Sequence, residues 1–210
     1  MNLSTNNKYK EPAVRRIFDV LFSTAVLLLG AIPVFLPIAA VIAVTGNRPV
    51  IFKQKRNGLN GKVFLCYKFH TLKAKKNQTG NNENKIANQD TFDFIPLGKF
   101  LRSTGLDELP QFFNVLKGDM SVVGPRPMMV EENEFFMSKI PGYEKRFEVK
   151  PGITGLAQIE GYKGKITSLQ FMKDRLDKDM EYINGHSFKG DLIIIGKTFL
   201  GVFGFRKKNK

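Results

Sequence analysis

The 210-residue sequence predicts an α+β fold: a small cytoplasmic domain of helices and short strands on an N-terminal re-entrant membrane hairpin, made of a helix, a break and a second helix. Three observations lead to this fold class. Residues 17–44 carry no charge except Asp19, two short runs rich in β-branched and aromatic residues follow, and apolar residues then recur mostly at helical spacing. Interfacial amphipathic helices complete the predicted architecture.

Residues 17–44 are the candidate membrane element. A spanning helix needs about 20 apolar residues, so the run is long enough, but Pro33 and Pro37 remove backbone donors and predict a break near Pro33. Basic residues flank both ends, namely Lys8, Lys10, Arg15 and Arg16 before the run and Arg48, Lys53, Lys55 and Arg56 after it. Because basic flanks mark the cytoplasmic side, a re-entrant helix-break-helix is predicted. A single kinked span is the alternative.

The charge of the chain also favours a membrane surface. Lys and Arg number 33 against 19 Asp and Glu, which gives a net charge of +14. This balance suits either nucleic acid or the anionic cytoplasmic leaflet. The apolar run decides for the membrane, and no nucleic-acid partner is predicted. Cys66 is the only cysteine, so no intrachain disulfide can form, which is typical of a cytoplasm-facing protein.

Two parts are predicted along the chain: residues 1–48, with the basic N-terminus and the membrane element, and residues 49–210, a cytoplasmic and interfacial domain that holds the candidate site. Strands are predicted at residues 50–52 and 63–71, with a turn at 57–61 between them. Residues 73–90 are polar and rich in Asn and Lys, which predicts a mobile loop. This loop is either a solvated excursion or a lid over a site.

Helices are predicted at residues 94–117, 131–140 and 169–183 from their apolar periodicity. The first is interrupted at residues 103–105 and ends at Gly118. Residues 192–205 are apolar and glycine-spaced, but they are shorter than the roughly 17 residues that a span requires. They are therefore predicted to lie in the membrane interface, held there by the basic C-terminal tail.

Asp107 and Glu108 are the candidate catalytic residues. They are adjacent carboxylates at the predicted start of a helix, with Pro110 in its first turn. Taken alone, the pair is better explained by helix capping, because the exposed amides and the dipole at that end attract negative charge. The same field keeps a carboxylate ionised, as a nucleophile requires, and attracts phosphate. One carboxylate could then attack or hold a metal while the other assists.

Several cations could converge on this pair. Arg126 stands between two prolines, so its guanidinium would lose little entropy on binding a phosphate in bidentate fashion, although a structural salt bridge competes with this reading. Lys68 lies on a predicted strand, and Lys150 precedes a Pro-Gly turn whose amides could hold an anion. Arg175 and Asp179 have the i, i+4 spacing of a simple helix pair. Two histidines with one cysteine give no zinc site.

Taken together, these motifs resemble the bacterial sugar transferase family, the monotopic phosphoglycosyl transferases. The resemblance runs from Arg15 to about Thr198. Its most specific motifs are Leu106-Asp107-Glu108-Leu109-Pro110-Gln111, residues 113–121, Val123-Gly124-Pro125-Arg126-Pro127, and Pro151-Gly152-Ile153-Thr154-Gly155 followed by Gln158. Each motif is a modest signal alone, but their order along the chain is very specific.

The resemblance implies a re-entrant membrane helix and the transfer of a sugar-1-phosphate from a UDP-sugar to polyprenyl (undecaprenyl) phosphate, with release of UMP. It implies that Asp107 is the nucleophile and a Mg²⁺ ligand, forming a covalent phosphosugar intermediate, and that Glu108 is its partner. The substrate-binding candidates are Lys68, Arg126, Pro127 and Asp179, with Arg102, Lys150, Gln158 and Arg175 as weaker additions. The implied location is the cytoplasmic face of the bacterial inner membrane, among membrane lipids.

The implied reaction would start the assembly of a surface polysaccharide or glycoconjugate, and an inactive membrane scaffold of such a pathway is the alternative. Downstream glycosyltransferases are a partner class that the resemblance leaves open, and the oligomeric state is not indicated. The short chain favours acetamido-sugar donors by analogy. Three residues depart from the usual family pattern: His70 and Lys150 replace arginines, and Ile32 replaces a serine before Pro33.

Overall fold

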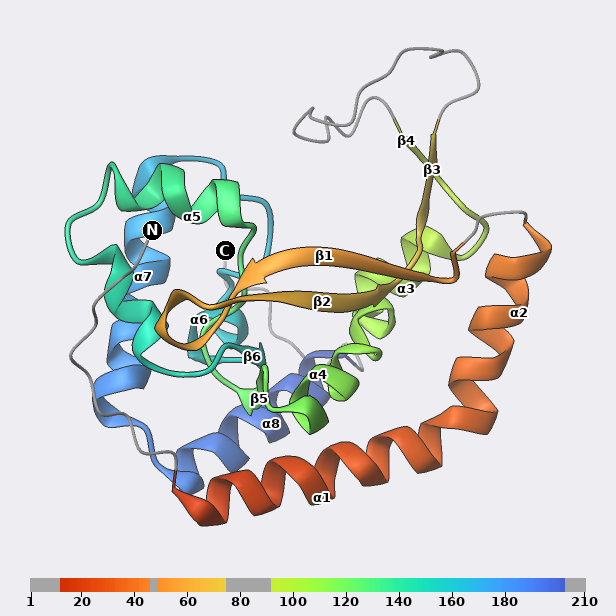
Figure 1. Ribbon diagram of the computed structural model, residues 1–210, viewed down its shortest axis with the longest axis horizontal. Helices are drawn as coiled ribbons and strands as arrows, with labels where there is room; N and C mark the ends of the chain where they lie inside the picture. Colours follow the sequence, from red (N-terminus) through yellow and green to blue (C-terminus); the bar gives the residue numbers. More distant parts are fainter. Residues whose placement is uncertain (1–11, 46–48, 75–91, 203–210) are drawn as a thin grey trace.

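A long N-terminal helix runs along one side of a domain of short strands and helices, and a second helix turns up beside that domain (Figure 1). The computed structural model describes residues 12–45, 49–74 and 92–202. The charged flanks at Lys8, Lys10 and Arg48 and the basic C-terminal tail lie outside these ranges. The predicted mixture of helices and short strands is confirmed.

The N-terminal element is a bent pair of helices. Helix α1 (Ala13–Gly30) continues through a π-helical turn (Ala31–Phe35) into α2 (Leu36–Val44). The break therefore falls where Pro33 was expected to cause it, since proline cannot donate its backbone hydrogen bond. Within the described ranges, no single helix has both the length and the apolarity to cross a bilayer. Ala13–Gly30 and Pro33–Val44, bent by 57°, satisfy both requirements only as a pair.

The first two strands form the predicted hairpin. Strands β1 (Ile51–Asn57) and β2 (Val63–Phe69) pair antiparallel with Ile51 opposite Phe69, and a 3₁₀ turn at Leu59–Gly61 connects them. Strand β1 extends beyond residue 52, its predicted end, because the polar residues that follow also pair with β2. This hairpin supplies one wall of the candidate site.

A second small hairpin begins where the sequence predicted the start of the mobile loop. Strand β3 (Leu72–Ala74) pairs antiparallel with β4 (Phe92–Phe94). Residues 73 and 74, which were expected to belong to the loop, are therefore strand residues. Residues 75–90, the rest of the predicted loop, lie outside the described ranges.

The predicted helices are present, with shifted ends. They are α3 (Gly98–Thr104), a 3₁₀ turn (Leu106–Glu108), α4 (Gln111–Lys117), α5 (Val130–Met137), α7 (Leu169–Gly185) and, over most of the predicted interfacial segment, α8 (Phe188–Val202). The structure adds a 3₁₀ segment (Tyr143–Glu148) and the short helix α6 (Leu156–Ile159), which were not predicted. The predicted break is at Gly105 (φ 77°) and α4 ends at Gly118 (φ 87°). Both glycines adopt the left-handed conformation that favours this residue.

Two loops that carry sequence motifs are fixed by close backbone packing. Strands β5 (Ser121–Val123) and β6 (Gly152–Thr154) pair in parallel. A Cβ atom on Gly152 would lie 2.0 Å from the backbone nitrogen of Gly124, so only glycine allows the strands to approach this closely. The loop that begins at Gly124 and carries Arg126 is therefore held against the loop after Lys150.

Both ends of the bent helix pair pack on the same domain. Phe18 and Phe22 of α1 contact the core that contains Phe112 and Val122. At the other end, Ile38 and Ile42 of α2 join a separate core with Phe69, Ile95 and Leu101. The opposite sides of the pair expose apolar residues, namely Val14, Ile17, Leu21, Leu28, Leu29, Leu36 and Val44.

Two arginines that were expected to mark a basic membrane flank are instead bound by the protein. Arg15, only 5% exposed, donates to the Val123 carbonyl at 2.6 Å and pairs with Asp191 at 3.3 Å. Arg16 donates to the carbonyls of Val115 and Leu116 at the end of α4, at 2.6 and 2.8 Å. These charges fix α1 to the domain, so they carry less weight as evidence of membrane topology.

Candidate functional site

Three segments that are distant in sequence bring Lys68, Glu108 and Arg126 together. Lys68 Nζ on β2 lies 2.9 Å from Glu108 Oε1. Arg126, in the loop after β5, places Nη2 2.6 Å from the same oxygen and Nη1 3.1 Å from Oε2. Glu108 thus receives a bidentate arginine and a lysine, which is among the strongest arrangements for a charged pair. The structure assembles the cations that the sequence placed near the acidic pair.

Glu108 remains ionised in this setting. Burial alone would raise its pKa, but the charges of Arg126 and Lys68 and the hydrogen bonds from Arg126 outweigh it and hold the pKa well below the usual range. Both oxygens accept hydrogen bonds from cations. Glu108 therefore orients Arg126 and Lys68 and is unsuited to donate a proton.

Asp107 differs from its neighbour because its carboxylate has no hydrogen-bond or ion-pair partner among the residues of the described ranges. The residue is 8% exposed. Burial and the charge of Glu108 raise its pKa above the ordinary value, against the opposing charges of Lys68, Arg102 and Arg126. A carboxylate without a partner inside a cationic site is available for a ligand, a metal ion or a reacting phosphorus atom.

The position of the acidic pair corrects one step of the sequence argument. Asp107 and Glu108 were expected in the first turn of a helix whose field would keep them ionised. They lie instead in the 3₁₀ turn Leu106–Glu108, and α4 begins only at Gln111. The helix field therefore does not set the pKa of Asp107, which burial raises. The nearby cations are what favour its ionised form.

The described residues around the acidic pair could hold Mg²⁺ together with water and a bound phosphate. No group of three or more His, Cys, Asp or Glu residues in the described part of the chain could bind a metal ion. Magnesium, however, is usually bound by one or two carboxylates, water and substrate phosphates rather than by a complete protein cage. The unpaired oxygens of Asp107 fit that role, whereas those of Glu108 already accept from cations.

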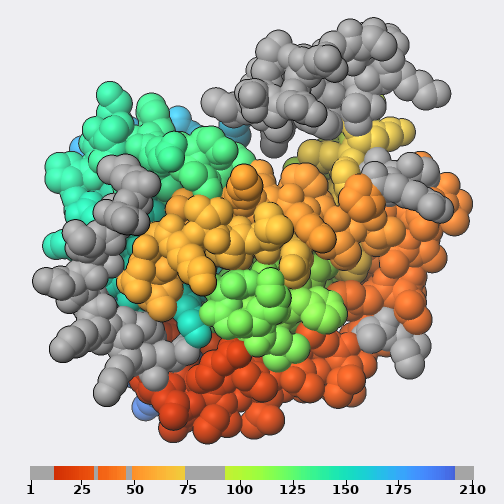
Figure 2. Space-filling model, viewed as in Figure 1, coloured from red at the N-terminus to blue at the C-terminus, as the bar shows by residue number. Residues whose placement is uncertain are grey.

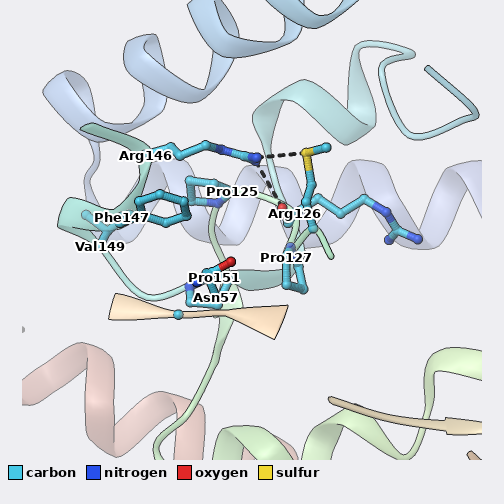
Figure 3. Close-up of a pocket in the computed structure, with 10 residues that line it drawn as sticks. Asn57, Pro125, Arg126, Pro127, Arg146, Phe147, Val149 and Pro151 are labelled. Atoms are coloured by element: carbon cyan, nitrogen blue, oxygen red, sulfur yellow. Dashed lines mark hydrogen bonds between the residues drawn. The ribbon is translucent and has the colours of Figure 1, made fainter. Parts of the chain in front are cut away.

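A second ion pair lies behind the loop of Arg126. Arg146 Nη2 is 2.8 Å from Asp179 Oδ2 and 3.0 Å from the carbonyl oxygen of Arg126. Figure 3 shows Arg146 reaching this carbonyl and the Met128 sulfur, while the side chain of Arg126 points away from it. Asp179 therefore contributes through Arg146, which holds the backbone of the loop.

Arg175 is the most unusual cation of this cluster. It is 2% exposed, and its Nε and Nη2 atoms have no hydrogen-bond partner among the residues that the structure describes. Burial, together with the charge of Arg146, lowers its pKa to about 10 despite the attraction of Asp179. The expected pairing of Arg175 with Asp179 is not formed as a hydrogen bond, because Asp179 bonds Arg146. Positive charge is thus in excess behind the Arg126 loop, which favours an anionic ligand nearby.

Comparison with protein families identifies the chain. The model of the bacterial sugar transferase family matches residues 10–205. The chain belongs to this family.

Curated relatives agree with this assignment. The chain is 46% identical, over 93% of its length, to the UDP-glucose:undecaprenyl-phosphate glucose-1-phosphate transferase of Klebsiella pneumoniae, and 43% identical, also over 93%, to the enzyme of that name from Escherichia coli (strain K12). It spans only 41% of either relative. It is also 37% identical to the uncharacterized sugar transferase EpsL of Bacillus subtilis (strain 168), over 88% of this chain and 85% of that protein.

The remaining predicted site residues of this chain lie around the site and support it. Arg102 donates to Thr71 Oγ1 at 2.9 Å and is coupled to Asp107 only through its charge. Gln158 Nε2 donates to the carbonyl of Ile153 at 2.9 Å, which stabilises the loop after β6. These two side chains are therefore bonded to protein groups rather than directed at the carboxylates.

Pro127 and Lys150 contribute through their backbones. The carbonyl of Pro127 accepts from Arg56 Nη1 at 3.3 Å. A Cβ atom on Gly124 would lie 2.5 Å from the carbonyl oxygen of Lys150. Both contacts fix the loop that carries Arg126.

Two basic residues near the site were missed by sequence reasoning. Arg146 lies 33 positions before its partner Asp179, and no local spacing indicates such a contact. Lys163 lies beside Gly105, since a Cβ there would meet its Nζ at 3.1 Å, and its charge helps to lower the pKa of Glu108. The basic, glycine-rich run 161–165 around Lys163 was a signal that could have found it.

Proposed function

We propose that this sugar transferase moves a sugar-1-phosphate from a UDP-sugar to polyprenyl phosphate, with Asp107 as the nucleophile. The observation that carries the proposal is the contrast within the acidic pair. Glu108 is fully engaged by Arg126 and Lys68, whereas Asp107 beside it is buried and without a partner in the described residues. A nucleophile needs that freedom, and the cations around it suit a diphosphate substrate.

The names of the relatives support the substrate classes. Two of them are named for UDP-glucose and undecaprenyl phosphate. A relative from Aeromonas hydrophila, 36% identical, is named for UDP-N-acetylgalactosamine and the same lipid. Because the chain spans about two fifths of the first two relatives, the activity of this chain is inferred. UDP-glucose and UDP-N-acetylgalactosamine are the first donors to test.

Two displacements at phosphorus account for the transfer. In the first, a carboxylate oxygen of Asp107 attacks the phosphorus next to the sugar, the bond from that phosphorus to the bridging oxygen breaks, and UMP leaves with its electron pair. In the second, a phosphate oxygen of the polyprenyl phosphate attacks the same phosphorus and the Asp107 carboxylate is released. Dividing the reaction in this way allows a soluble donor and a lipid acceptor to react in turn.

The charged residues have separate tasks in this scheme. Arg126 and Lys68, held by Glu108, stabilise negative charge on the phosphates. Arg146 holds the carbonyl of Arg126 and so fixes the position of that loop. Mg²⁺, held by Asp107 and the substrate phosphates, would supply further charge neutralisation.

We also infer that the bent helix pair is re-entrant and that the domain lies at the cytoplasmic face of the membrane. The support is that α1 and α2 pack on the same domain through two separate cores. Opposite ends of a true span would emerge on different sides of the bilayer. The exposed apolar residues of both helices, including Leu28 at 72% and Val44 at 87%, would then face lipid.

UMP release tests the reaction class. Full-length protein in detergent is incubated with Mg²⁺, undecaprenyl phosphate and each UDP-sugar in turn, beside Asp107→Asn. Release from one donor by the wild type alone supports the proposal. If Asp107→Asn releases UMP at a comparable rate, Asp107 is not the nucleophile. If the folded wild type releases UMP from no donor of a broad panel, the transferase proposal fails.

A further inference from the structure

An apolar groove of about 800 Å³ lies between the β1–β2 hairpin and α4. This volume is within the range of roughly 300–1,000 Å³ that is usual for ligand clefts. Its apolar walls include Val50 and Ile51 from the start of β1, and Phe113 and Leu116 from α4. Phe113 is 48% exposed, so a large apolar surface remains uncovered there.

Two lysines, Lys53 and Lys117, line the groove beside Tyr67. Lys53 Nζ lies 5.9 Å and Lys117 Nζ 5.3 Å from the centre of the Tyr67 ring. Lys117 also hydrogen-bonds the Tyr67 hydroxyl at 3.3 Å and pairs with Asp119 at 3.3 Å. Two lysines and one carboxylate leave a net positive charge here. Both lysines make cation–π contacts with the Tyr67 ring.

This groove is separate from the candidate active site. Lys53 and Tyr67 are opposite one another in the hairpin, so their side chains share a face. Lys68, the next residue along β2, points to the other face, where it binds Glu108. A phosphate held by Lys53 and Lys117 would therefore lie across the hairpin from the acidic pair and would not be a reactant.

Both walls of the groove adjoin the helices assigned to the membrane. On the β1 side, Val50 and Ile51 pack against the core that contains Ile42 of α2. On the α4 side, the ring of Phe112 lies 6.1 Å from Phe22 of α1. Figure 2 shows the orange hairpin directly above the green α4, with the red and orange helices of the pair below and beside them. A lipid from the bilayer could enter here without crossing the polar domain.

We propose that this groove binds one anionic phospholipid, with an acyl chain along Ile51 and Phe113 and the phosphate between Lys53 and Lys117. The groove is complementary in charge to such a lipid: its walls are apolar, and among the described residues that line it the only charged ones are Lys53 and Lys117. Basic clusters beside a membrane element select anionic headgroups. The proposal depends on the membrane placement inferred above and is independent of the transfer chemistry.

Native mass spectrometry of the full chain in detergent tests this site. The protein is titrated with phosphatidylglycerol or with phosphatidylcholine of the same acyl chains. The wild type should retain phosphatidylglycerol selectively. Lys53→Gln with Lys117→Gln should reduce that retention by roughly tenfold or more. Lys55→Gln with Lys139→Gln makes the same change in charge at exposed lysines that do not line the groove, and it should retain the lipid.

The contributions of the lipid's acyl chain and of its headgroup to binding are tested separately. Phe113→Gln should weaken retention of the long-chain lipid, and glycerol phosphate, which has no chain, should not displace it. The assignment is overturned if the double variant retains phosphatidylglycerol as the wild type does, or if glycerol phosphate competes on equal terms. It is also overturned if undecaprenyl phosphate replaces the lipid one for one with the same dependence on Lys53 and Lys117. UMP release is measured on the same samples, so that loss of transfer with intact lipid selectivity counts against the proposed reaction alone.

Discussion

Asp19 Oδ1 accepts a hydrogen bond from the backbone N–H of Val122 at 2.9 Å, although Asp19 is the single charge of the apolar run 17–44. Val122 belongs to β5, whose end leads directly into the loop of Arg126. Arg15, one helical turn earlier, donates to the carbonyl of Val123. Helix α1 therefore satisfies backbone groups of β5, and the bent helix pair and the loop of Arg126 are attached to the same strand.

Asp19→Leu should destabilise the protein by about 1–3 kcal/mol, because the buried N–H of Val122 would lose its acceptor. Asp19→Asn keeps an oxygen at that position and should cost less. Thermal unfolding in detergent measures both variants beside the wild type. An unfolding temperature for Asp19→Leu equal to that of the wild type would show that the bond contributes nothing.

Glu108 and Arg126 should behave as one unit in a double-mutant cycle. Glu108→Gln and Arg126→Lys each break the bidentate pair, and each should lower kcat/KM by roughly 10²-fold, since a preorganised phosphate ligand is lost or misplaced. The double variant should lose much less than the product of the two effects. The cycle is measured by initial rates of UMP release. Strictly multiplicative losses would mean that the two residues act independently.

As the pH is lowered, kcat/KM should begin to fall at a higher pH than the ordinary pKa of an aspartate would predict. The raised pKa of Asp107 means that its carboxylate is protonated, and so unable to attack, at a higher pH than usual. Glu108, whose pKa is depressed, stays ionised throughout and should add no inflection. A pH profile of kcat/KM checks this. A rate that stays flat to below pH 4 would contradict the raised pKa.

Asp107→Asn should abolish turnover, by at least about 10³-fold, without lowering stability at neutral pH. When folding raises the pKa of a group, the protonated group stabilises the folded state. This stabilisation is lost as the pH rises through the pKa of the group in the folded state. The neutral amide mimics the protonated acid, so the variant should match or exceed the wild type in unfolding temperature at pH 7.5. The difference should shrink as the pH falls. A clear loss of stability at pH 7.5 would contradict the assignment.

Single cysteines test the re-entrant arrangement. The cysteines are placed at residues 8 and 48 in a Cys66→Ser background. Both should react with an impermeant maleimide in inverted vesicles, whose cytoplasmic face is outside, and neither should react in intact right-side-out vesicles. The native Cys66 is 1% exposed, which makes its replacement a mild change. Labelling of the two positions from opposite sides would make the helix pair a true span.

Local signals explain the parts of the fold that the sequence predicted well. The turn of the β1–β2 hairpin, the break at Gly105 and the end of α4 at Gly118 each depend on residues within a few positions of one another. The acidic pair and Arg126 were likewise found from short motifs. Their assembly depends on the glycine-mediated contact of β5 and β6, which no single segment shows.

Contacts between distant segments explain what was missed. Arg146 bonds Asp179 across 33 positions, whereas helical spacing offered Arg175 as the nearer candidate. Arg15 and Arg16 looked like basic flanking residues because their partners lie about a hundred positions away. The pKa of Asp107 was misjudged because burial, which depends on the whole fold, outweighs its position along the chain.

The most direct test of the proposed reaction is the state of Asp107 after exposure to donor alone. Wild-type protein is incubated with Mg²⁺ and the preferred UDP-sugar without polyprenyl phosphate. The protein is then digested, and the mass of the peptide that contains Asp107 is measured by mass spectrometry. One equivalent of UMP and a sugar phosphate on Asp107 are expected, and the sugar phosphate should disappear when undecaprenyl phosphate is added. An unmodified Asp107 peptide, with UMP formed only when the acceptor is present, would contradict the proposed reaction.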